Sequence, residues 1–286
     1  MRTRDLLAFG EEILKKAGLS KEEARREALL TLGHLLEKRP LEVYLVPEVS
    51  EETASRLLSI LKKRAQGVPL AYLLGEVEFF GRRFLVSSGV LIPRPETEIL
   101  VESVLKHLQK GPLLELGVGS GCVSLTLALE APELEIFGVE KSHKALRVAL
   151  ENRKRWGLEK KVHFVLGDWL TPFKKRPFFK AVVSNPPYVA EEEWPFLPPE
   201  VREHEPREAL VGGKKGLSFI KRTLKEAPAF LIPGGFVFLE IGYQQRKSVE
   251  ELALQLGYRC LWIQDLLGHA RVLVARLKAD PELSYE

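Results

Sequence analysis

The chain has 286 residues, of which 45% are hydrophobic and 29% charged, as is typical of one or two globular domains. Its formal net charge of +4 permits a nucleic-acid partner without indicating one, because a dedicated binder usually carries a clustered basic face. No run approaches the roughly 18 apolar residues of a membrane span, and residues 1–20 lack the apolar stretch of a secretory signal. Cys122 and Cys260 have no metal-ligand spacing, so we expect no metal site and a reducing, cytoplasmic setting.

Methionine and asparagine are scarce in this sequence. Met1 is the only methionine, and Asn152 and Asn185 are the only asparagines. Beside plentiful glutamate, lysine and arginine, this scarcity indicates either a thermophilic source or the codon bias of a GC-rich genome. In both cases, an asparagine that is retained in such a chain invites a chemical explanation.

Residues 1–74 are predicted to form a small helical domain. Apolar positions recur at helical spacing from the start of the chain, and Ser20 with Glu23 forms a capping box for a helix that continues to Leu36. Ser50 is the expected cap of a further helix. Nothing in this domain has the pattern of a catalytic site.

Residues 75–94 are predicted to be a linker. Within them, 78–86 has the pattern of a β-hairpin around a glycine turn. The prolines within 93–95 then exclude regular structure. We place the start of the second domain, 95–286, directly after them.

The second domain is predicted to alternate strands and helices. Strands are expected at 113–116, 135–139, 162–166, 179–184, 236–241, 258–264 and 271–275, and helices near 96–105, 121–130, 142–156, 215–228 and 245–256. Such alternation is typical of a mainly parallel sheet covered by helices on both faces. Because the last two strands leave no room for a helix between them, we expect the last strand to be antiparallel. The predicted fold class is a Rossmann-like α/β sheet with a helical N-terminal domain and a β-hairpin linker.

A glycine-rich turn follows the first strand of this sheet, in the segment Glu115-Leu116-Gly117-Val118-Gly119-Ser120-Gly121. Ligands bind beyond the carboxyl ends of strands in open α/β sheets, and glycines let the backbone approach them closely. The dinucleotide fingerprint would need glycine at position 122, where Cys122 stands. The pattern therefore favours a ligand without phosphates, with a plain tight turn as the alternative.

Two acidic residues follow the next two strands in corresponding positions. Glu140 ends the second strand, about 20 residues beyond the glycines, where a carboxylate accepts hydrogen bonds from ribose hydroxyls. Asp168 follows the third strand and can accept from an adenine amino group, while Trp169 can pack on the ring. Each acid taken alone is more simply a solvated loop residue. Together with the glycines, they resemble the class I methyltransferase fold, which binds S-adenosyl-L-methionine and releases S-adenosyl-L-homocysteine.

The fourth strand ends in Ser184-Asn185-Pro186-Pro187-Tyr188. Paired prolines fix the backbone and remove two N–H donors, so the loop offers acceptors, including the Asn185 side-chain oxygen. A substrate –NH2 group can place one N–H on Asn185 and the other on the Pro186 carbonyl, which directs its lone pair at the methyl donor. Tyr188 can lie against the flat face of the substrate. The alternative is a proline-rich turn without chemical function.

Three further segments narrow the choice of substrate. They are 67–81, 91–98 and 205–210, the last with Gly212, Gly213 and Gly216. These segments resemble the release factor glutamine methyltransferases (the HemK family), and the resemblance spans nearly the whole chain. It implies methylation of the glutamine side-chain nitrogen in the Gly-Gly-Gln loop of class 1 peptide-chain release factors.

The resemblance also implies the roles of individual residues. The reaction residues would be Asn185, Pro186, Pro187 and Tyr188. The cofactor residues would be Glu115, Gly117, Val118, Gly119, Ser120, Gly121, Glu140, Lys141, Asp168, Trp169 and Asn185. Glu115 and Glu140 stand where aspartate is common in the family, which lengthens the carboxylate without changing the expected reaction. Arg94 and Thr97 either close over the methionine end of the cofactor or brace the hinge.

Two alternatives remain at this point. The helical domain is implied to recognise the release factor, but a stabilising cap without a partner has the same pattern. Asn-Pro-Pro-Tyr also resembles enzymes that methylate exocyclic amino groups of adenine or guanine in nucleic acids. Such a target needs a basic stripe and base-stacking surfaces, whereas charges of both signs are mixed in this sequence. A non-catalytic module would bind the cofactor without transferring the methyl group.

Overall fold

The computed structural model describes residues 1–277, and the chain divides into two compact units. The first unit comprises Met1–Glu76 and Pro198–His204, and the second comprises Val77–Leu197 and the residues from Glu205 onward. The first unit is therefore discontinuous in sequence. The predicted domain boundaries at 74/75 and 94/95 concern functional roles, which compactness does not test, so they stay a prediction.

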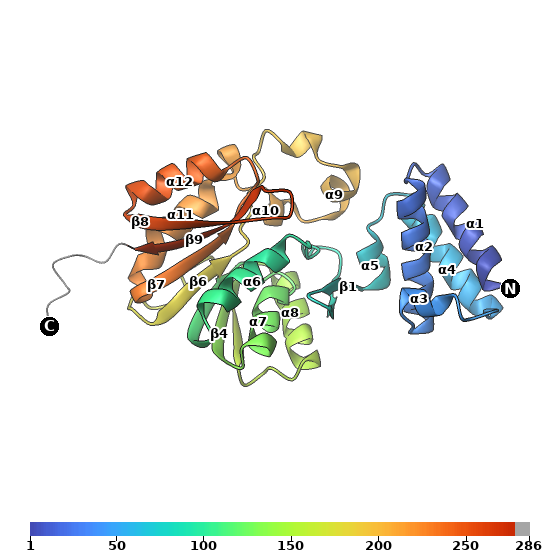
Figure 1. Ribbon diagram of the computed structural model, residues 1–286, viewed down its shortest axis with the longest axis horizontal. Coiled ribbons are helices and arrows are strands. Elements are labelled where there is room, and N and C mark those ends of the chain that lie inside the picture. Colours follow the sequence, from blue (N-terminus) through green and yellow to red (C-terminus); the bar gives the residue numbers. More distant parts are fainter. Residues whose placement is uncertain (278–286) are drawn as a thin grey trace, which may run out of the picture. The chain divides into compact units, whose positions relative to one another are not determined.

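The first unit is helical, and its residues 1–76 are coloured blue to cyan in Figure 1. It contains α1 (Thr3–Lys16), α2 (Lys21–Leu36), α3 (Pro40–Val43), α4 (Glu51–Ala65), α5 (Leu70–Leu74) and, from the later segment, α9 (Pro199–His204). The predicted capping box is confirmed, because Ser20 accepts from the Glu23 amide and the Glu23 carboxylate accepts from the Ser20 amide. Ser50 likewise caps α4 by accepting from the Thr53 amide. The helices enclose a leucine-rich core.

A buried guanidinium fixes the later segment to this unit. Arg64 of α4 is 8% exposed, and its Nε and Nη2 donate to the two carboxylate oxygens of Glu27 at 2.7 and 3.1 Å. Its Nη2 also lies 2.9 Å from Glu200 Oε2 on α9. A buried guanidinium needs partners for its fixed fork of donors. This cluster therefore joins α2, α4 and α9.

The second unit is built on a 7-stranded sheet with the strand order β5-β4-β3-β6-β7-β9-β8. The strands are β3 (Lys110–Leu116), β4 (Glu133–Glu140), β5 (Val162–Leu166), β6 (Phe179–Ser184), β7 (Leu231–Glu240), β8 (Tyr258–Gln264) and β9 (Ala270–Leu277). The pairs from β5 to β7 are parallel, and β9 is antiparallel to both β7 and β8. The predicted Rossmann-like sheet with an antiparallel last strand is confirmed.

Side chains that alternate along the strands fill two separate cores. Leu113, Val183 and Phe238 pack with α6 and α7, whereas their sequence neighbours Leu114 and Val182 pack with α11 and α12. The helices are α6 (Thr97–His107), α7 (Cys122–Glu130), α8 (His143–Arg155), α11 (Ser218–Glu226) and α12 (Arg246–Gln255). Figure 1 shows α6, α7 and α8 together on one side of the sheet. Because both faces are covered, the strands are apolar at successive positions.

The predicted hairpin consists of β1 (Glu76–Phe79) and β2 (Arg82–Leu85). Phe79 and Phe84 are buried against the α6–α7 side of the sheet, which anchors the hairpin to the second unit. Between β6 and α11 the chain forms the short helix α10 (Arg207–Leu210) and 3-10 turns at Trp194–Phe196 and Lys214–Gly216, and a third 3-10 turn, Ala227–Ala229, follows α11.

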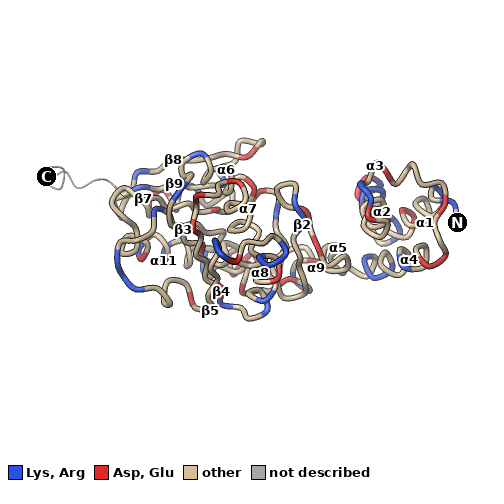
Figure 2. Tube along the Cα trace, turned by 90° about the horizontal axis from the view of Figure 1, so that it is seen from below, with Lys and Arg blue, Asp and Glu red and all other residues tan. Residues whose placement is uncertain are grey.

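Charges of both signs are interspersed along the trace of each unit, as Figure 2 shows. Within residues 1–277, no helix has both the length and the apolar composition that crossing a bilayer requires.

Candidate functional site

A cavity of about 500 Å³ lies in the second unit, where four neighbouring parallel strands end. This is within the size range of small-ligand sites, roughly 300–1,000 Å³. Eight of the predicted site residues line it, namely Gly117, Gly119, Glu140, Lys141, Asp168, Trp169, Asn185 and Pro187. The other lining residues are Gly89, Leu91, Val139, Ser142, Ala145, Gly167, Pro206, Glu208, Ala209 and Phe219.

The glycine turn after β3 holds the carboxylate that ends β4. Gly119 has a φ of +60°, a conformation that glycine adopts at little cost. Its amide donates to Glu140 Oε2 at 2.8 Å, and the Ser142 amide donates to Oε1 at 2.8 Å. Each carboxylate oxygen keeps a lone pair for a further donor. Burial, together with the charge of Glu208, raises the pKa of Glu140, while the backbone amides act to lower it.

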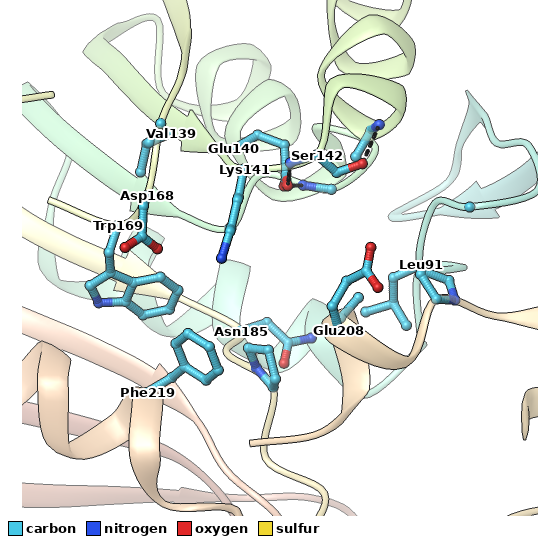
Figure 3. Close-up of a pocket in the computed structure, with 18 residues that line it drawn as sticks. Leu91, Val139, Glu140, Lys141, Ser142, Asp168, Trp169, Asn185, Glu208 and Phe219 are labelled. Carbon is cyan, nitrogen blue, oxygen red and sulfur yellow. Dashed lines mark hydrogen bonds between the residues drawn. The ribbon is translucent and has the colours of Figure 1, made fainter. Parts of the chain in front are cut away.

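Two aromatic rings form the apolar side of the cavity (Figure 3). The rings of Trp169 and Phe219 lie 4.9 Å apart, and Trp169 Nε1 donates to Thr223 Oγ1 at 3.1 Å. Trp169 has a φ of +57°, a strained conformation for a tryptophan that surrounding contacts must hold. Beside it, Arg222 Nη1 donates to Asp168 Oδ2 at 3.1 Å, which leaves Asp168 Oδ1 for a ligand.

The Asn185 side chain has a defined orientation at the end of β6. Ser184 Oγ donates to the Leu116 carbonyl at 2.7 Å, which ties this strand end to β3. Asn185 Nδ2 donates to Thr97 Oγ1 at 3.0 Å, and Thr97 is buried at the start of α6. The amide oxygen of Asn185 is therefore turned away from Thr97 and can accept a hydrogen bond from a ligand.

The loop after Asn185 packs against the glycine-rich segment 212–216. The Gly212 amide donates to the Val189 carbonyl at 2.9 Å, and Gln245 Nε2 donates to the Tyr188 carbonyl at 2.9 Å. A methyl group on Gly216 would overlap the Tyr188 carbonyl oxygen, and one on Gly212 would overlap the carbonyl oxygen of Pro187. The glycines thus allow two backbone segments to approach each other closely.

Tyr188 faces a second hollow of about 460 Å³, which is also lined by Val189, Lys215, Tyr243 and Arg271. Its hydroxyl donates to Glu240 Oε1 at 3.3 Å, and burial raises its pKa. Since Asn185 and Pro187 line the first cavity, the Asn-Pro-Pro-Tyr loop forms part of the wall of both hollows.

The remaining predicted residues lie outside the first cavity's lining. Glu115 is 2% exposed, and its carboxylate accepts from the Ser124 hydroxyl and, at 3.1 Å, from the Ser124 amide. Burial raises the pKa of Glu115 to about 8. Val118, Ser120, Gly121, Pro186 and Tyr188 also do not line this cavity. The cofactor role of Glu115 stays a prediction.

Sequence reasoning left out several residues of this site. Glu208 and Phe219 line the cavity, and Glu205 is buried where it accepts from the Ile92 amide at 3.1 Å and pairs with Arg94. This pair gives Arg94 a partner in the second unit, and the choice between its two predicted roles stays a prediction. The signal for Glu205 was its place at the head of the 205–210 segment, but no spacing rule connects it to a residue 111 positions earlier.

Glu240 was also left out, although a signal for it exists. It is the last residue of β7 and 1% exposed. A lone acid at the end of an apolar strand has the same sequence position as Glu140 on β4. That position at the carboxyl edge of the sheet is where ligand sites lie.

This sheet order, with a cavity at the strand ends that combines a glycine turn, an acid and Asn-Pro-Pro-Tyr, defines a class I methyltransferase fold. A methyltransferase from Pyrococcus furiosus has a solved structure with the same fold, at a TM-score of 0.53 and 21% identity, covering 81% of this chain and 100% of that one. Residues 5–75 match the family model of the PrmC N-terminal domain, and residues 95–196 match the methyltransferase small domain.

Relatives of known name cover almost the whole chain. The release factor glutamine methyltransferase of Thermodesulfovibrio yellowstonii is 40% identical over 256 residues, which are 87% of this chain and 91% of that protein. The protein of the same name from Bacillus cereus is 38% identical over 288 residues, 97% of this chain and 100% of that protein. The chain belongs to the release factor glutamine methyltransferase family.

Proposed function

We propose that this protein transfers a methyl group from S-adenosyl-L-methionine to the side-chain amide nitrogen of the glutamine in the Gly-Gly-Gln loop of class 1 peptide-chain release factors. The observation that carries the proposal is that Asn185 and Pro187 line the same cavity as Glu140 and Trp169. Methyl acceptor and methyl donor would therefore meet at one strand edge. Membership of the family supports the class of substrate.

The cavity residues fit the cofactor. S-adenosyl-L-methionine, when bound, supplies an electrophilic methyl group on a sulfonium and leaves as S-adenosyl-L-homocysteine. Glu140 keeps acceptor capacity for ribose hydroxyls, and the Trp169 and Phe219 rings offer an apolar surface for a flat base. Among the described lining residues Lys141 is the only cation, so the cavity suits a ligand with a carboxylate better than one with several phosphates.

An amide nitrogen is a weak nucleophile because its lone pair is delocalised, so alignment is the main contribution that the protein can make. Asn185 Oδ1 and the Pro186 carbonyl would accept the two N–H bonds of the substrate amide. Well-oriented groups gain on the order of 7–11 kcal/mol over free encounter. A general base is unnecessary, since the methylated nitrogen becomes acidic and loses its proton to water. Tyr188 would support the flat face of the amide.

The domain roles complete the proposal. Residues 1–74 would recognise the release factor, 75–94 would link the domains, and 95–286 would carry out methyl transfer. The last nine of these residues lie outside the described part of the chain. Because release factors act on ribosomes, we propose that the protein works in the cytoplasm.

The proposal is tested with labelled S-adenosyl-L-methionine. A release factor, the same factor with its loop glutamine changed to alanine, duplex DNA and ribosomal RNA are offered in parallel. We expect label on the intact factor alone. Label on nucleic acid instead would overturn the proposed substrate while retaining the proposed chemistry of the Asn-Pro-Pro-Tyr loop.

The role of Asn185 is tested by Asn185→Ala. We expect single-turnover methyl transfer to fall by roughly 100-fold or more, as loss of a key orienting group does, because the substrate amide loses one of its two acceptors. Calorimetry should show S-adenosyl-L-methionine binding largely unchanged, since Glu140 and Trp169 remain. Undiminished turnover would contradict the role.

A further inference from the structure

The buried carboxyl group of Glu240 has no part in the chemistry described so far. It ends β7, next to β6, and the register pairs the preceding residue, Leu239, with Ser184. Glu240 therefore lies level with the start of the Asn-Pro-Pro-Tyr loop. A buried carboxylate is costly unless hydrogen-bond donors compensate its charge. Which donors face Glu240 thus indicates what it does.

Two hydroxyl groups that stabilise the charged form of Glu240, those of Tyr188 and Thr97, are connected to the Asn-Pro-Pro-Tyr loop. Tyr188 itself belongs to the loop and donates to Glu240 Oε1 at 3.3 Å. The hydroxyl of Thr97 favours the charged form of Glu240, whose second carboxylate oxygen, Oε2, is buried without a hydrogen-bond partner among the described residues. The Thr97 oxygen in turn accepts from Asn185 Nδ2 at 3.0 Å. Donation from the Thr97 hydroxyl to the unpartnered Glu240 Oε2 would give the order Asn185 to Thr97 to Glu240, with each group donating to the next.

This direction of donation would fix the orientation of the Asn185 side-chain amide. A threonine hydroxyl has one proton, and when it points at a carboxylate only the oxygen lone pairs remain for Asn185. Asn185 must then present Nδ2 to Thr97 and Oδ1 to the opposite side. In the reversed amide, two oxygens would face each other without a proton between them, which is unfavourable.

We propose that Glu240 is a positioning residue for methyl transfer, which acts through Thr97 to keep the oxygen of Asn185 directed at the substrate nitrogen and through Tyr188 to hold the rest of the loop. The inference rests on the proposed function, because it matters to the reaction only if Asn185 accepts from the substrate amide. In this proposal, the role of Thr97 is to orient the Asn185 side chain through its hydrogen bond to Nδ2.

The arrangement requires ionised Glu240. A protonated Glu240 can donate to Thr97, whose own proton then turns to Asn185 and draws the amide oxygen away from the substrate. Burial raises the pKa of Glu240 to about 7, and Glu96 adds to this, while Thr97, Tyr188 and Arg271 oppose it. Burial and the charges of Glu115 and Glu240 raise the pKa of the Cys122 thiol on α7. The reversal is therefore expected as the pH falls through about 7.

The amide can be observed directly, because Asn152 and Asn185 are the only asparagines in the chain. Protein labelled with 15N only in asparagine should give two side-chain NH2 pairs. Asn152 is the internal control, since its Nδ2 is bound by the Leu85 and Ser120 carbonyls at 2.9 Å. Between pH 5.5 and 8.5 we expect the Asn185 pair to shift with a midpoint near 7 while the Asn152 pair does not.

The variants decide whether Glu240 causes this titration. Glu240→Gln keeps the size but removes the charge, so the Asn185 shift should disappear. Thr97→Val should abolish it as well, and Thr97→Ser, which restores the hydroxyl, should recover it. An Asn185 pair that does not titrate in the parent protein, or that titrates unchanged in Glu240→Gln, would overturn the proposal. Unshifted Asn152 signals report that each variant is folded. If Glu240→Gln does not fold, the comparison of Thr97→Val with Thr97→Ser still decides the proposal.

Activity gives the second readout. Glu240→Gln and Thr97→Val should lower kcat by roughly 10- to 100-fold, as misplacement of a reacting group does, with cofactor Kd nearly unchanged. In the parent protein kcat should decline below pH 7, and this decline should be absent in Glu240→Gln. If the parent protein fails to methylate a release factor, the proposed function is wrong, yet the spectra still test the positioning of Asn185.

Discussion

Three buried carboxyl groups lie near the carboxyl edge of the sheet, and their surroundings differ. Glu140 is held by backbone amides at the cavity, Glu240 accepts from the Tyr188 hydroxyl, and Glu115 accepts from Ser124 away from the cavity. Burial raises the pKa of all three. Such groups couple folding to pH, because the folded and unfolded chains bind different numbers of protons.

Glu115 provides a test of this coupling. Its pKa rises from 4.5 in an exposed setting to about 8 in the folded protein, so the folded state retains a proton that the unfolded chain has lost. The associated stability is fully present below pH 4.5 and is lost as the pH rises through 8. Between pH 6 and 9 the loss should be on the order of 2 kcal/mol.

Glu115→Gln should remove this loss, because a glutamine has no proton to release. Urea denaturation followed by tryptophan fluorescence measures it in the second unit, which contains all four tryptophans, Trp156, Trp169, Trp194 and Trp262. We expect the variant to lose less stability than the parent protein between pH 6 and 9. Parallel stability curves for the two proteins would contradict the raised pKa.

Residue patterns predicted much of the site's location but not its connections. The glycine turn, Glu140 and Asn185 could be found because each follows a strand, and strand ends meet at one edge of a parallel sheet. The contacts of Thr97 and Glu205 could not be predicted, since their partners Asn185 and Arg94 lie 88 and 111 positions away in the sequence. Sequence spacing carries no information about such contacts until the topology is known.

At the scale of elements, the strands and long helices were predictable because apolar runs in a doubly covered sheet are strong signals. The segment between β6 and α11 was not predicted as structure. It is rich in proline and glycine, and its helices, such as α10, span only a few residues. It adopts its shape from contacts with the Asn-Pro-Pro-Tyr loop, as at the Val189–Val211 bridge.

Gly216→Ala tests whether this segment sets the position of the loop. A methyl group there would overlap the Tyr188 carbonyl oxygen, so the loop must shift to accommodate it. We expect kcat to fall at least about 10-fold, because small displacements of aligned groups are costly. Steady-state kinetics and cofactor titration measure both effects, and cofactor Kd should change little.

Gly257→Ala is the matched control. Gly257 also has positive φ, +83° against +66° at Gly216, but a methyl group there meets no described atom within 4 Å. Both variants should lose about 1 to 2 kcal/mol from the strained backbone, whereas only Gly216→Ala should lose activity. Equal activity in the two variants would argue against control of the loop by Gly216.

At the scale of the whole molecule, the division into two units does not follow the order of the chain. Residues 198–204 belong to the helical unit although the sequence on both sides of them belongs to the α/β unit. No local pattern predicts this, because α9 is only six residues long and Glu200 pairs with Arg64, which lies far away in the sequence. A fragment that ended before residue 198 would lack this part of the first unit.

The cluster around Arg64 predicts a ranked series of stabilities for the helical unit. Glu27→Ala removes both bonds to a buried guanidinium and should cost about 3–5 kcal/mol, as breaking a buried pair does. Glu200→Ala should cost at most about 1 kcal/mol, because its side chain is 38% exposed and solvent screens the pair. Glu203→Ala on the same short helix is the control, since its side chain is 61% exposed, and its change should stay within about 0.5 kcal/mol.

Native-state hydrogen exchange of α2 and α4 amides resolves the effects within this unit. If Glu200→Ala and Glu203→Ala left α4 equally protected, residues 198–204 would not stabilise the helical unit in solution.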